Sequence, residues 1–105
     1  MAIGKQYNPL PTFLTIKTSA VHGLGIFTNK KILNNTELGM SHMIINETIF
    51  RTPLGGFYNH SEEPNCIKYE KKNIHQRIDY LYLKTICDIE EGEELLVKYT
   101  LYGLV

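Results

Sequence analysis

Turn residues divide this chain into short segments, and none of the segments carries a clear helical periodicity. Turns are predicted at His22-Gly23, Asn34-Asn35, Pro53-Leu54-Gly55-Gly56, Glu63-Pro64-Asn65 and Glu91-Gly92. Glycine, proline and asparagine favour such positions because they adopt or enforce backbone conformations that regular elements exclude. Many short segments between turns are typical of a mostly β architecture. We therefore expect several small sheets and little helix, with one short helical turn near Gly55–Tyr58.

The segment from Arg77 to Ile86 carries the clearest strand pattern. Apolar side chains occur on both faces of its two-residue alternation, as in a strand buried within a sheet. We expect this strand to be central. Further strands are predicted around Phe13–Ile16 and at Leu24–Thr28 and Leu95–Tyr99, and a short edge strand at Ile67–Lys71. The segment Ile44–Phe50 is compatible with either a strand or a loop.

Length and charge limit the class of protein. The chain has 105 residues, which predicts one domain over residues 1–105, with residues 1–11 as a loosely ordered N-terminal segment. The hydrophobic share of 43% and the charged share of 21% are typical of a folded globular protein. The formal net charge of +0 argues against a dedicated nucleic-acid binder, which needs a basic excess or a basic face.

The two cysteines, Cys66 and Cys87, bear on the cellular compartment. The segment Met1–Leu10 has no apolar core of the kind found in signal peptides. Two cysteines without such a leader predict free thiols in a reducing compartment. No stretch approaches the roughly 20 apolar residues of a membrane span. We expect a cytoplasmic protein that does not bind membranes.

Two glycine-containing segments carry residues that can bind a ligand. In Val21–Phe27, alternate glycines allow either a tight turn into a strand or the close approach of a ligand. The third glycine and the helix of a dinucleotide-binding loop are absent. The second segment is Gly55–Cys66. In it, Asn59 and His60 lie between the turn residues Gly55-Gly56 and Pro64-Asn65, and their side chains can stabilise a polar turn or bind a ligand. His60 and Cys66 are too few for a structural zinc site, which needs about four ligands.

A third segment, Asp88–Tyr99, combines an acidic run with a tyrosine. Glu90, Glu91, Glu93 and Glu94 are typical of a solvated turn, although such a cluster can also attract a basic substrate segment. Taken alone, Tyr99 is more typical of a core aromatic than of a catalytic residue.

The order of these three segments carries more information than any one of them. The first motif is Gly23-Leu24-Gly25, at the start of a predicted strand. The second is Asn59-His60-Ser61 followed by Pro64-Asn65-Cys66. The third is Gly92-Glu93-Glu94-Leu95 followed by Val97 and Tyr99. This pattern resembles the signature of SET domains, a family of protein-lysine methyltransferases, over about residues 19–102. The resemblance implies a SET-type β-clip of small curved sheets. It also implies a C-terminal pseudoknot between residues 59–61 and 95–99.

The resemblance further implies a methyltransferase that uses S-adenosylmethionine and acts on a lysine side chain of a protein or peptide. The backbone around His22, Gly23, Leu24 and Gly25 would line the methionine part of the cofactor. Asn59 and His60 would hold the cofactor, with the backbone of His60 at the adenine. Tyr99 would be the catalytic tyrosine, and the substrate channel would comprise Phe57, Tyr99 and Tyr102. Tyr102 would close the channel or stack on the adenine.

The chain departs from the family pattern in several ways, one of which is Gly56 in place of the arginine that often precedes the motif's phenylalanine. Asn59 follows Gly25 by only 34 positions, where most relatives carry a longer insert that forms one wall of the substrate groove. The family's Tyr-x-Gly motif is missing, since no tyrosine lies between Ile26 and Phe57. No cysteine follows Cys87, so the zinc cluster of some relatives cannot form, and we expect no metal. The missing wall could come from a second subunit, which predicts a homodimer.

Two functions remain open at this point. An intact Asn59-His60 motif and Tyr99 favour an active protein-lysine methyltransferase. The short insert and the missing Tyr-x-Gly tyrosine favour a non-catalytic SET-like module that binds a cofactor, a peptide or a partner protein.

Overall fold

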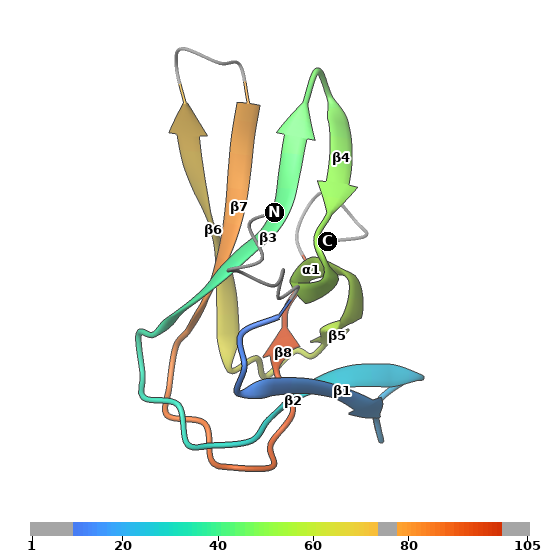
Figure 1. The fold of residues 1–105 in the computed structure, drawn as a ribbon, viewed down its shortest axis with the longest axis vertical. Helices are drawn as coiled ribbons and strands as arrows, with labels where there is room; N and C mark the ends of the chain where they lie inside the picture. Colours follow the sequence, from blue (N-terminus) through green and yellow to red (C-terminus); the bar gives the residue numbers. More distant parts are fainter. Residues whose placement is uncertain (1–9, 74–77, 100–105) are drawn as a thin grey trace, which may run out of the picture.

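The computed structural model describes residues 10–73 and 78–99, which form two sheets and one short helix (Figure 1). The smaller sheet pairs β1 (Leu14–Thr18) with β2 (Leu24–Thr28). The larger sheet has the strand order β4-β3-β7-β6-β8-β5. Its strands are β3 (Glu37–Ile45), β4 (Thr48–Arg51), β5 (Asn59–His60), β6 (Cys66–Asn73), β7 (Ile78–Thr85) and β8 (Leu96–Val97). The helix is α1 (Pro53–Phe57), and the predicted mostly β fold is confirmed.

Strand β7 is central, as its alternation predicts. It pairs antiparallel with β3 on one side and with β6 on the other. Leu81 and Leu83 are buried, whereas Tyr80 and Tyr82 are half-buried. Figure 1 shows the long strands β3, β4, β6 and β7 extending together, with β1 and β2 lying across their base.

The segment Ile44–Phe50, which the sequence left open, forms the turn of a β-hairpin. Ile45 pairs with Thr48, so Asn46 and Glu47 are the two loop residues. Both have positive φ angles, 49° and 68°. A two-residue loop with two left-handed residues matches the right-handed twist of the strands that it joins. Glutamate rarely adopts this conformation, which is why the sequence gives no turn signal here.

Strand β6 is longer than predicted, and within the described residues only its first residue has a neighbouring strand on both sides. It pairs with β7 along its length, and Cys66 also pairs with Val97 of β8. At Ile67–Lys71 the strand pairs with β7 on one side, so the predicted edge position of this segment is confirmed. The contact that places β8 beside β6 joins residues 31 positions apart, so no local pattern could indicate it.

The C-terminal segment makes the pairing that the resemblance implies. Asn59 and His60 of β5 pair in parallel with Leu96 and Val97 of β8. The backbone N–H of Ser61 also donates to the carbonyl of Val97 at 3.1 Å. The strand is two residues long rather than Leu95–Tyr99, because the N–H of Tyr99 bonds to a side chain and not to a neighbouring strand.

The core lies where the two sheets, α1 and the C-terminal segment meet. Its buried residues come from elements far apart in the sequence: Leu14, Ile26, Ile32, Leu38, Leu54, Tyr58, Cys66, Leu83, Ile89, Leu95 and Val97. Leu10 packs against this cluster, whereas residues 1–9 of the predicted N-terminal segment lie outside the described residues. Within the described residues, no helix is long and apolar enough to cross a membrane.

Helix α1 is short but has a defined start. The Thr52 side chain accepts a hydrogen bond from the Gly55 N–H at 3.3 Å, and Pro53 occupies the first turn. Both features are typical of helix N-termini. The Thr52 hydroxyl lies 2.7 Å from the Met40 carbonyl, to which it donates, so the cap also fixes the helix to β3. The chain leaves α1 in extended conformation at Tyr58, directly before Asn59.

Candidate functional site

Asn59 joins three segments of the chain through one amide group. Its Nδ2 donates to the carbonyls of His22 and Leu24, both at 3.1 Å, and to Oε2 of Glu94 at 2.6 Å. All three neighbours accept hydrogen bonds only, which fixes the orientation of the amide. The side chain is buried, with 7% of the residue exposed. The motif at Asn59 therefore holds the Gly-x-Gly turn against the C-terminal acidic segment.

Glu94 extends this connection to the start of the turn. Its two carboxylate oxygens accept hydrogen bonds from the Ser19 hydroxyl at 2.7 and 2.8 Å. The Ser19 oxygen in turn accepts the Val21 N–H at 2.9 Å. A methyl group at Gly25 would overlap the Glu94 carboxylate and lie 3.1 Å from Asn59 Nδ2. A side chain at position 25 would therefore displace the Glu94 carboxylate from its hydrogen bonds.

His60 holds the segment that carries Tyr99. The backbone N–H of Tyr99 donates to His60 Nδ1 at 2.9 Å, and the two rings lie 4.9 Å apart between centroids. Because Nδ1 accepts this bond, a neutral His60 carries its proton on Nε2, which faces Glu62 at 3.4 Å. A hydrogen bond and the charge of Lys98 lower the pKa of the Glu62 carboxyl.

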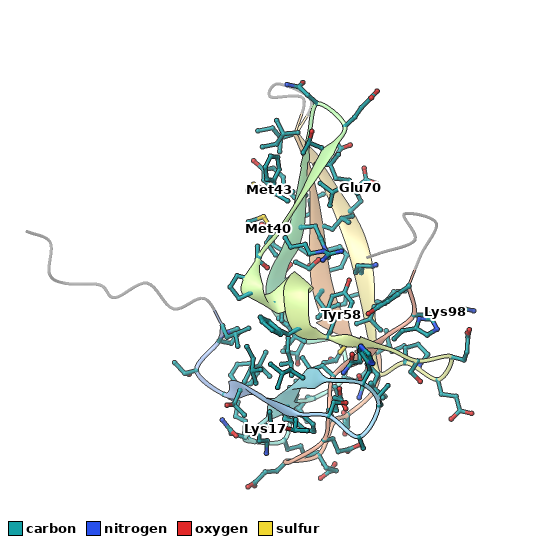
Figure 2. The ribbon with its side chains drawn as sticks, turned by 90° about the vertical axis from the view of Figure 1, so that its right-hand side faces the viewer. Lys17, Met40, Met43, Tyr58, Glu70 and Lys98 are labelled. Atoms are coloured by element: carbon teal, nitrogen blue, oxygen red, sulfur yellow. The ribbon has the colours of Figure 1, made fainter. Side chains whose placement is uncertain are left out.

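Tyr58, which is labelled in Figure 2, is buried and packs against Tyr99. Its ring meets the Tyr99 ring edge to face, with the centroids 6.1 Å apart. Tyr58 is 4% exposed whereas Tyr99 is 36% exposed, so the pair runs from the core to the surface. Burial, and then the neighbouring Tyr99, raise the pKa of the Tyr58 hydroxyl, which stays protonated at neutral pH.

His42 and Lys68 border the same tyrosine. The His42 ring lies 6.2 Å from the Tyr58 ring, and Lys68 Nζ lies 5.7 Å from the Tyr58 centroid. Burial, followed by the charges of Lys68 and Arg51, lowers the pKa of His42 to about 4. Burial lowers the pKa of the Lys68 amine to about 8. The site thus combines an exposed polar turn, an accessible tyrosine and a buried polar group behind it.

The sequence model of the SET-domain family matches residues 35–100, more than half of the chain. This chain belongs to the SET-domain family. The family match supports a methyltransferase in general terms. No curated protein is similar enough to the chain to count as a match.

Two solved structures are similar to this SET domain. A Plasmodium falciparum protein, provisionally assigned as a histone methyltransferase, has a TM-score of 0.71 at 20% identity; the match covers 88% of this chain and 96% of that one. Chaetomium thermophilum Polycomb Repressive Complex 2, autoinhibited and bound to S-adenosylmethionine, has a TM-score of 0.67 at 17% identity. That match covers 82% of this chain and 15% of the other. At these identities the similarity shows the fold.

The SET domain brings most of the predicted site residues into two neighbouring groups. Gly25 and the carbonyls of His22 and Leu24 lie around Asn59, and Gly23 lies between those two carbonyls in the chain. His60 lies against Tyr99. Phe57 is 36% exposed at the end of α1, and the ring that packs behind Tyr99 is that of its neighbour Tyr58. Tyr102 lies outside the described residues.

The sequence analysis missed several residues of the site: Ser19, His42, Tyr58, Lys68 and Glu94. Glu94 was grouped with a solvated acidic turn, although its place inside the Gly-Glu-Glu-Leu motif was a usable signal. Tyr58 lies inside the central motif between two residues that were selected. His42 and Lys68 have no signal in the sequence, because only the pairing of β3 and β6 with β7 brings them to Tyr58.

Cys66 lies apart from the polar part of this SET domain. It is buried, and burial, together with Cys87, raises the pKa of its thiol to about 12, whereas Cys87 is exposed. Both cysteines are free thiols. Among the described residues, no group of three or more potential metal ligands occurs. That no metal binds elsewhere in the chain stays a prediction.

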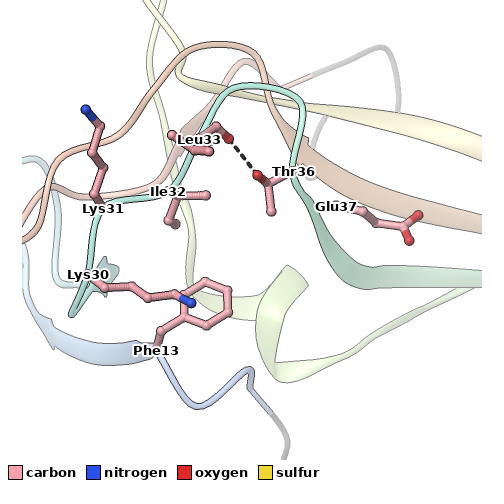
Figure 3. Close-up of a pocket in the computed structure, with 7 residues that line it drawn as sticks. All are labelled: Phe13, Lys30, Lys31, Ile32, Leu33, Thr36 and Glu37. Atoms are coloured by element: carbon pink, nitrogen blue, oxygen red, sulfur yellow. Dashed lines mark hydrogen bonds between the residues drawn. The ribbon is translucent and has the colours of Figure 1, made fainter.

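A pocket of about 340 Å³ opens elsewhere on the SET domain (Figure 3). It is lined by Phe13, Lys30, Lys31, Ile32, Leu33, Thr36 and Glu37. Lys30 Nζ lies over the Phe13 ring at 4.5 Å, and the Thr36 hydroxyl donates to the Leu33 carbonyl at 2.6 Å. None of these residues belongs to the predicted site, and Lys31 and Glu37 form ion pairs with residues outside the pocket.

Proposed function

We propose that this chain is an S-adenosylmethionine-dependent methyltransferase that methylates a lysine side chain of a protein or peptide. One observation carries the proposal: Asn59 and His60, which are adjacent in the central motif, bind the N-terminal Gly-x-Gly motif and the C-terminal motif that contains Tyr99. Asn59 binds the Gly-x-Gly turn, and His60 binds the backbone of Tyr99. The membership of the SET-domain family supports the same activity.

The residues at the turn fit the proposed cofactor. S-adenosylmethionine combines a positive charge with a flat base and supplies a methyl group that is already activated. Gly23 has φ +48° with open space in front of it, so a ligand can approach its backbone closely. The exposed Leu24 offers apolar surface, and the partly buried Glu94 offers negative charge nearby. His22, Gly23, Leu24, Gly25, Asn59 and His60 would hold the cofactor, and Tyr102 would border it.

The tyrosines would prepare the substrate lysine. With an ordinary pKa near 10.4, only about one lysine amine in a thousand is neutral at pH 7, and the charged form cannot attack. A poorly solvated channel beside a positive charge lowers that pKa. The hydroxyl of the partly exposed Tyr99 would orient the amine, while the buried Tyr58 beside it excludes water. Phe57 would line the outer part of the channel.

Methyl transfer from labelled cofactor to a panel of basic proteins tests the proposal. We expect label on lysine side chains of at least one protein, located by mass spectrometry of its peptides. Boiled enzyme and reactions with excess S-adenosylhomocysteine are the controls. If the folded wild-type protein labels nothing in the panel and does not label itself, the proposal is wrong.

A non-catalytic SET-like module is the second candidate. The span of only 34 positions from Gly25 to Asn59, and the missing Tyr-x-Gly tyrosine, favour it, because they leave less wall around a lysine channel. Calorimetry with S-adenosylmethionine separates the cases. Binding without turnover identifies a cofactor-binding module, and no binding identifies a domain that contacts a peptide or partner protein alone.

The assembly and location of the protein remain proposals. A homodimer would let a second copy complete the short groove, and sedimentation at micromolar concentration would detect it. The formal net charge of +0 supports a protein without a nucleic-acid partner. A cytoplasmic location without a membrane partner is part of the same proposal.

A further inference from the structure

Three buried polar atoms have no hydrogen-bond partner in the described part of the chain; one belongs to Tyr58, and the other two belong to residues beside its ring. They are His42 Nε2, the Tyr58 hydroxyl and Lys68 Nζ. His42 is 0% exposed and Tyr58 is 4% exposed. A buried polar group without a partner destabilises the folded state, so a cluster of three indicates that the site serves a purpose other than stability.

The hydrogen-bonding character of His42 can be assigned. The Ser41 hydroxyl uses its only proton on the Leu81 carbonyl at 3.1 Å, so its oxygen accepts from His42 Nδ1 at 2.9 Å. A neutral His42 therefore presents Nε2 as an acceptor. An acceptor, a hydroxyl and an amine without hydrogen-bond partners thus lie on Tyr58 and on two residues beside its ring.

Lys68 differs from the other lysines near it. Lys71, on the same strand, pairs with Glu37 at 2.9 Å, and Lys98 pairs with Glu62 at 3.2 Å, both at the surface. Lys68 Nζ is buried and faces the Tyr58 ring instead of a carboxylate. At a pKa of about 8, about a tenth of the molecules carry a neutral, nucleophilic amine at pH 7.

Tyr58 connects this amine to Tyr99. Cys66 of β6 is buried, and side chains two residues apart on a strand point to the same face, so Lys68 extends to the buried face of β6. Its Nζ lies 5.7 Å from the centroid of the Tyr58 ring, and the centroid of the Tyr99 ring lies 6.1 Å from the same ring. Tyr58 is thus a shared neighbour of the amine and of Tyr99.

We propose that Lys68 is itself a methyl acceptor, modified within its own molecule at the Tyr58–Tyr99 site. This inference rests on the proposed function, which supplies the methyl donor. The neutral Lys68 Nζ forms a bond to the methyl carbon, the bond from that carbon to sulfur breaks, and its electron pair stays on sulfur. The nitrogen becomes a methylammonium, which releases a proton to solvent before any second transfer. A methylated ammonium also suits the face of the Tyr58 ring.

Incubation of the purified protein with S-adenosylmethionine carrying a deuterated methyl group, and with no other substrate, tests this. We expect label on Lys68 in peptide mapping, at a rate per molecule that does not depend on protein concentration. Lys68→Arg should abolish the label, whereas Lys71→Arg should retain it. Label spread evenly over exposed lysines, or a rate that rises with concentration, would overturn the inference.

A second measurement does not depend on turnover. In side-chain NMR, S-adenosylhomocysteine should shift the resonances beside the Lys68 amine and leave those of Lys71 in place. If basic proteins are methylated while Lys68 remains unlabelled and unshifted, the inference fails and the proposed function stands. If the protein neither methylates any lysine nor binds the cofactor, the proposed function fails and the inference fails with it.

Discussion

Asn59 connects three segments through an amide whose neighbours all accept hydrogen bonds. Its replacement by a carboxylate would set two negative groups at hydrogen-bonding distance and leave two carbonyls without a donor. We expect Asn59→Asp to lower the free energy of unfolding by about 3 kcal/mol or more at pH 7. Urea denaturation measures this value.

A double variant tests whether Glu94 is the partner responsible. In Asn59→Asp with Glu94→Gln, the new amide can donate to the new carboxylate, so at least about 1 kcal/mol should be recovered. Glu91→Gln, an exposed change in the same acidic run, should alter stability by less than about 0.5 kcal/mol. Additive effects of the Asn59 and Glu94 changes would contradict the connection.

His42 makes stability depend on pH. Its pKa is about 4 in the folded protein and near 6.5 when unfolded, so the folded state binds fewer protons between these values. The stabilisation is fully present above pH 6.5 and is lost as pH falls towards 4, by up to about 3 kcal/mol. Unfolding free energies of the wild type at pH 7, 5.5 and 4.5 measure the loss.

Two measurements assign that loss to His42 rather than to carboxylates. His42→Leu cannot take up a proton and should show a shallower decline over the same range. In NMR of the wild type, the His42 ring should stay neutral, with its proton on Nδ1, at pH 5.5. A ring that titrates near pH 6.5 in the folded protein would contradict the burial argument.

At the scale of elements, α1 depends on one glycine of its Gly-Gly pair. A methyl group at Gly55 would overlap the Ser41 carbonyl and come within 2.8 Å of His42 Cε1, whereas one at Gly56 would meet nothing within 4 Å. We expect Gly55→Ala to destabilise the fold by about 2–4 kcal/mol, because α1 must move away from β3. Gly56→Ala should be neutral or stabilise by about 0.5–1 kcal/mol.

Thermal unfolding of the two variants measures this difference. The same displacement of α1 would move Tyr58 and Asn59, which follow it directly, so Gly55→Ala should also weaken cofactor binding. Equal stabilities of the two alanine variants would show that α1 does not pack on β3 as described.

The two thiols report on the whole molecule. Cys66 lies in the core where β6, β7 and β8 meet, and Cys87 is exposed. With iodoacetamide at pH 7.5, we expect one thiol to react in the native protein and the second only after denaturation. Mass spectrometry counts the adducts, and Cys87→Ser should leave the native protein unlabelled. Two adducts that form at similar rates would indicate that the core opens readily.

At the scale of the whole molecule, those parts of the fold were predictable whose segments carry a local sequence pattern or a family motif. The alternation around Leu81 and Leu83 located β7, and the motif order located the pairing of β5 with β8. The start of β3 was missed because Gly39, with φ +131°, and two register shifts interrupt the alternation. These irregularities have no local signature.

The site was predictable to the extent that its residues lie in the motifs. Asn59, His60 and Tyr99 were selected in advance and lie together. Glu94 resembles Glu90, Glu91 and Glu93 in sequence, and only the bridge from Phe27 to Glu94 makes it the inward member of the run. Lys68 could not be selected from the sequence, because the burial of its amine depends on strands that lie far apart in the chain.

Single-turnover methyl transfer by the wild type and by Tyr99→Phe is the most direct test of the central claim. The change removes one exposed hydroxyl and keeps the ring that packs on Tyr58 and His60. We predict that the rate falls about 100- to 10,000-fold while the affinity for S-adenosylmethionine in calorimetry is unchanged. Full-rate transfer by Tyr99→Phe, or no transfer by the wild type with any lysine substrate, would contradict the account.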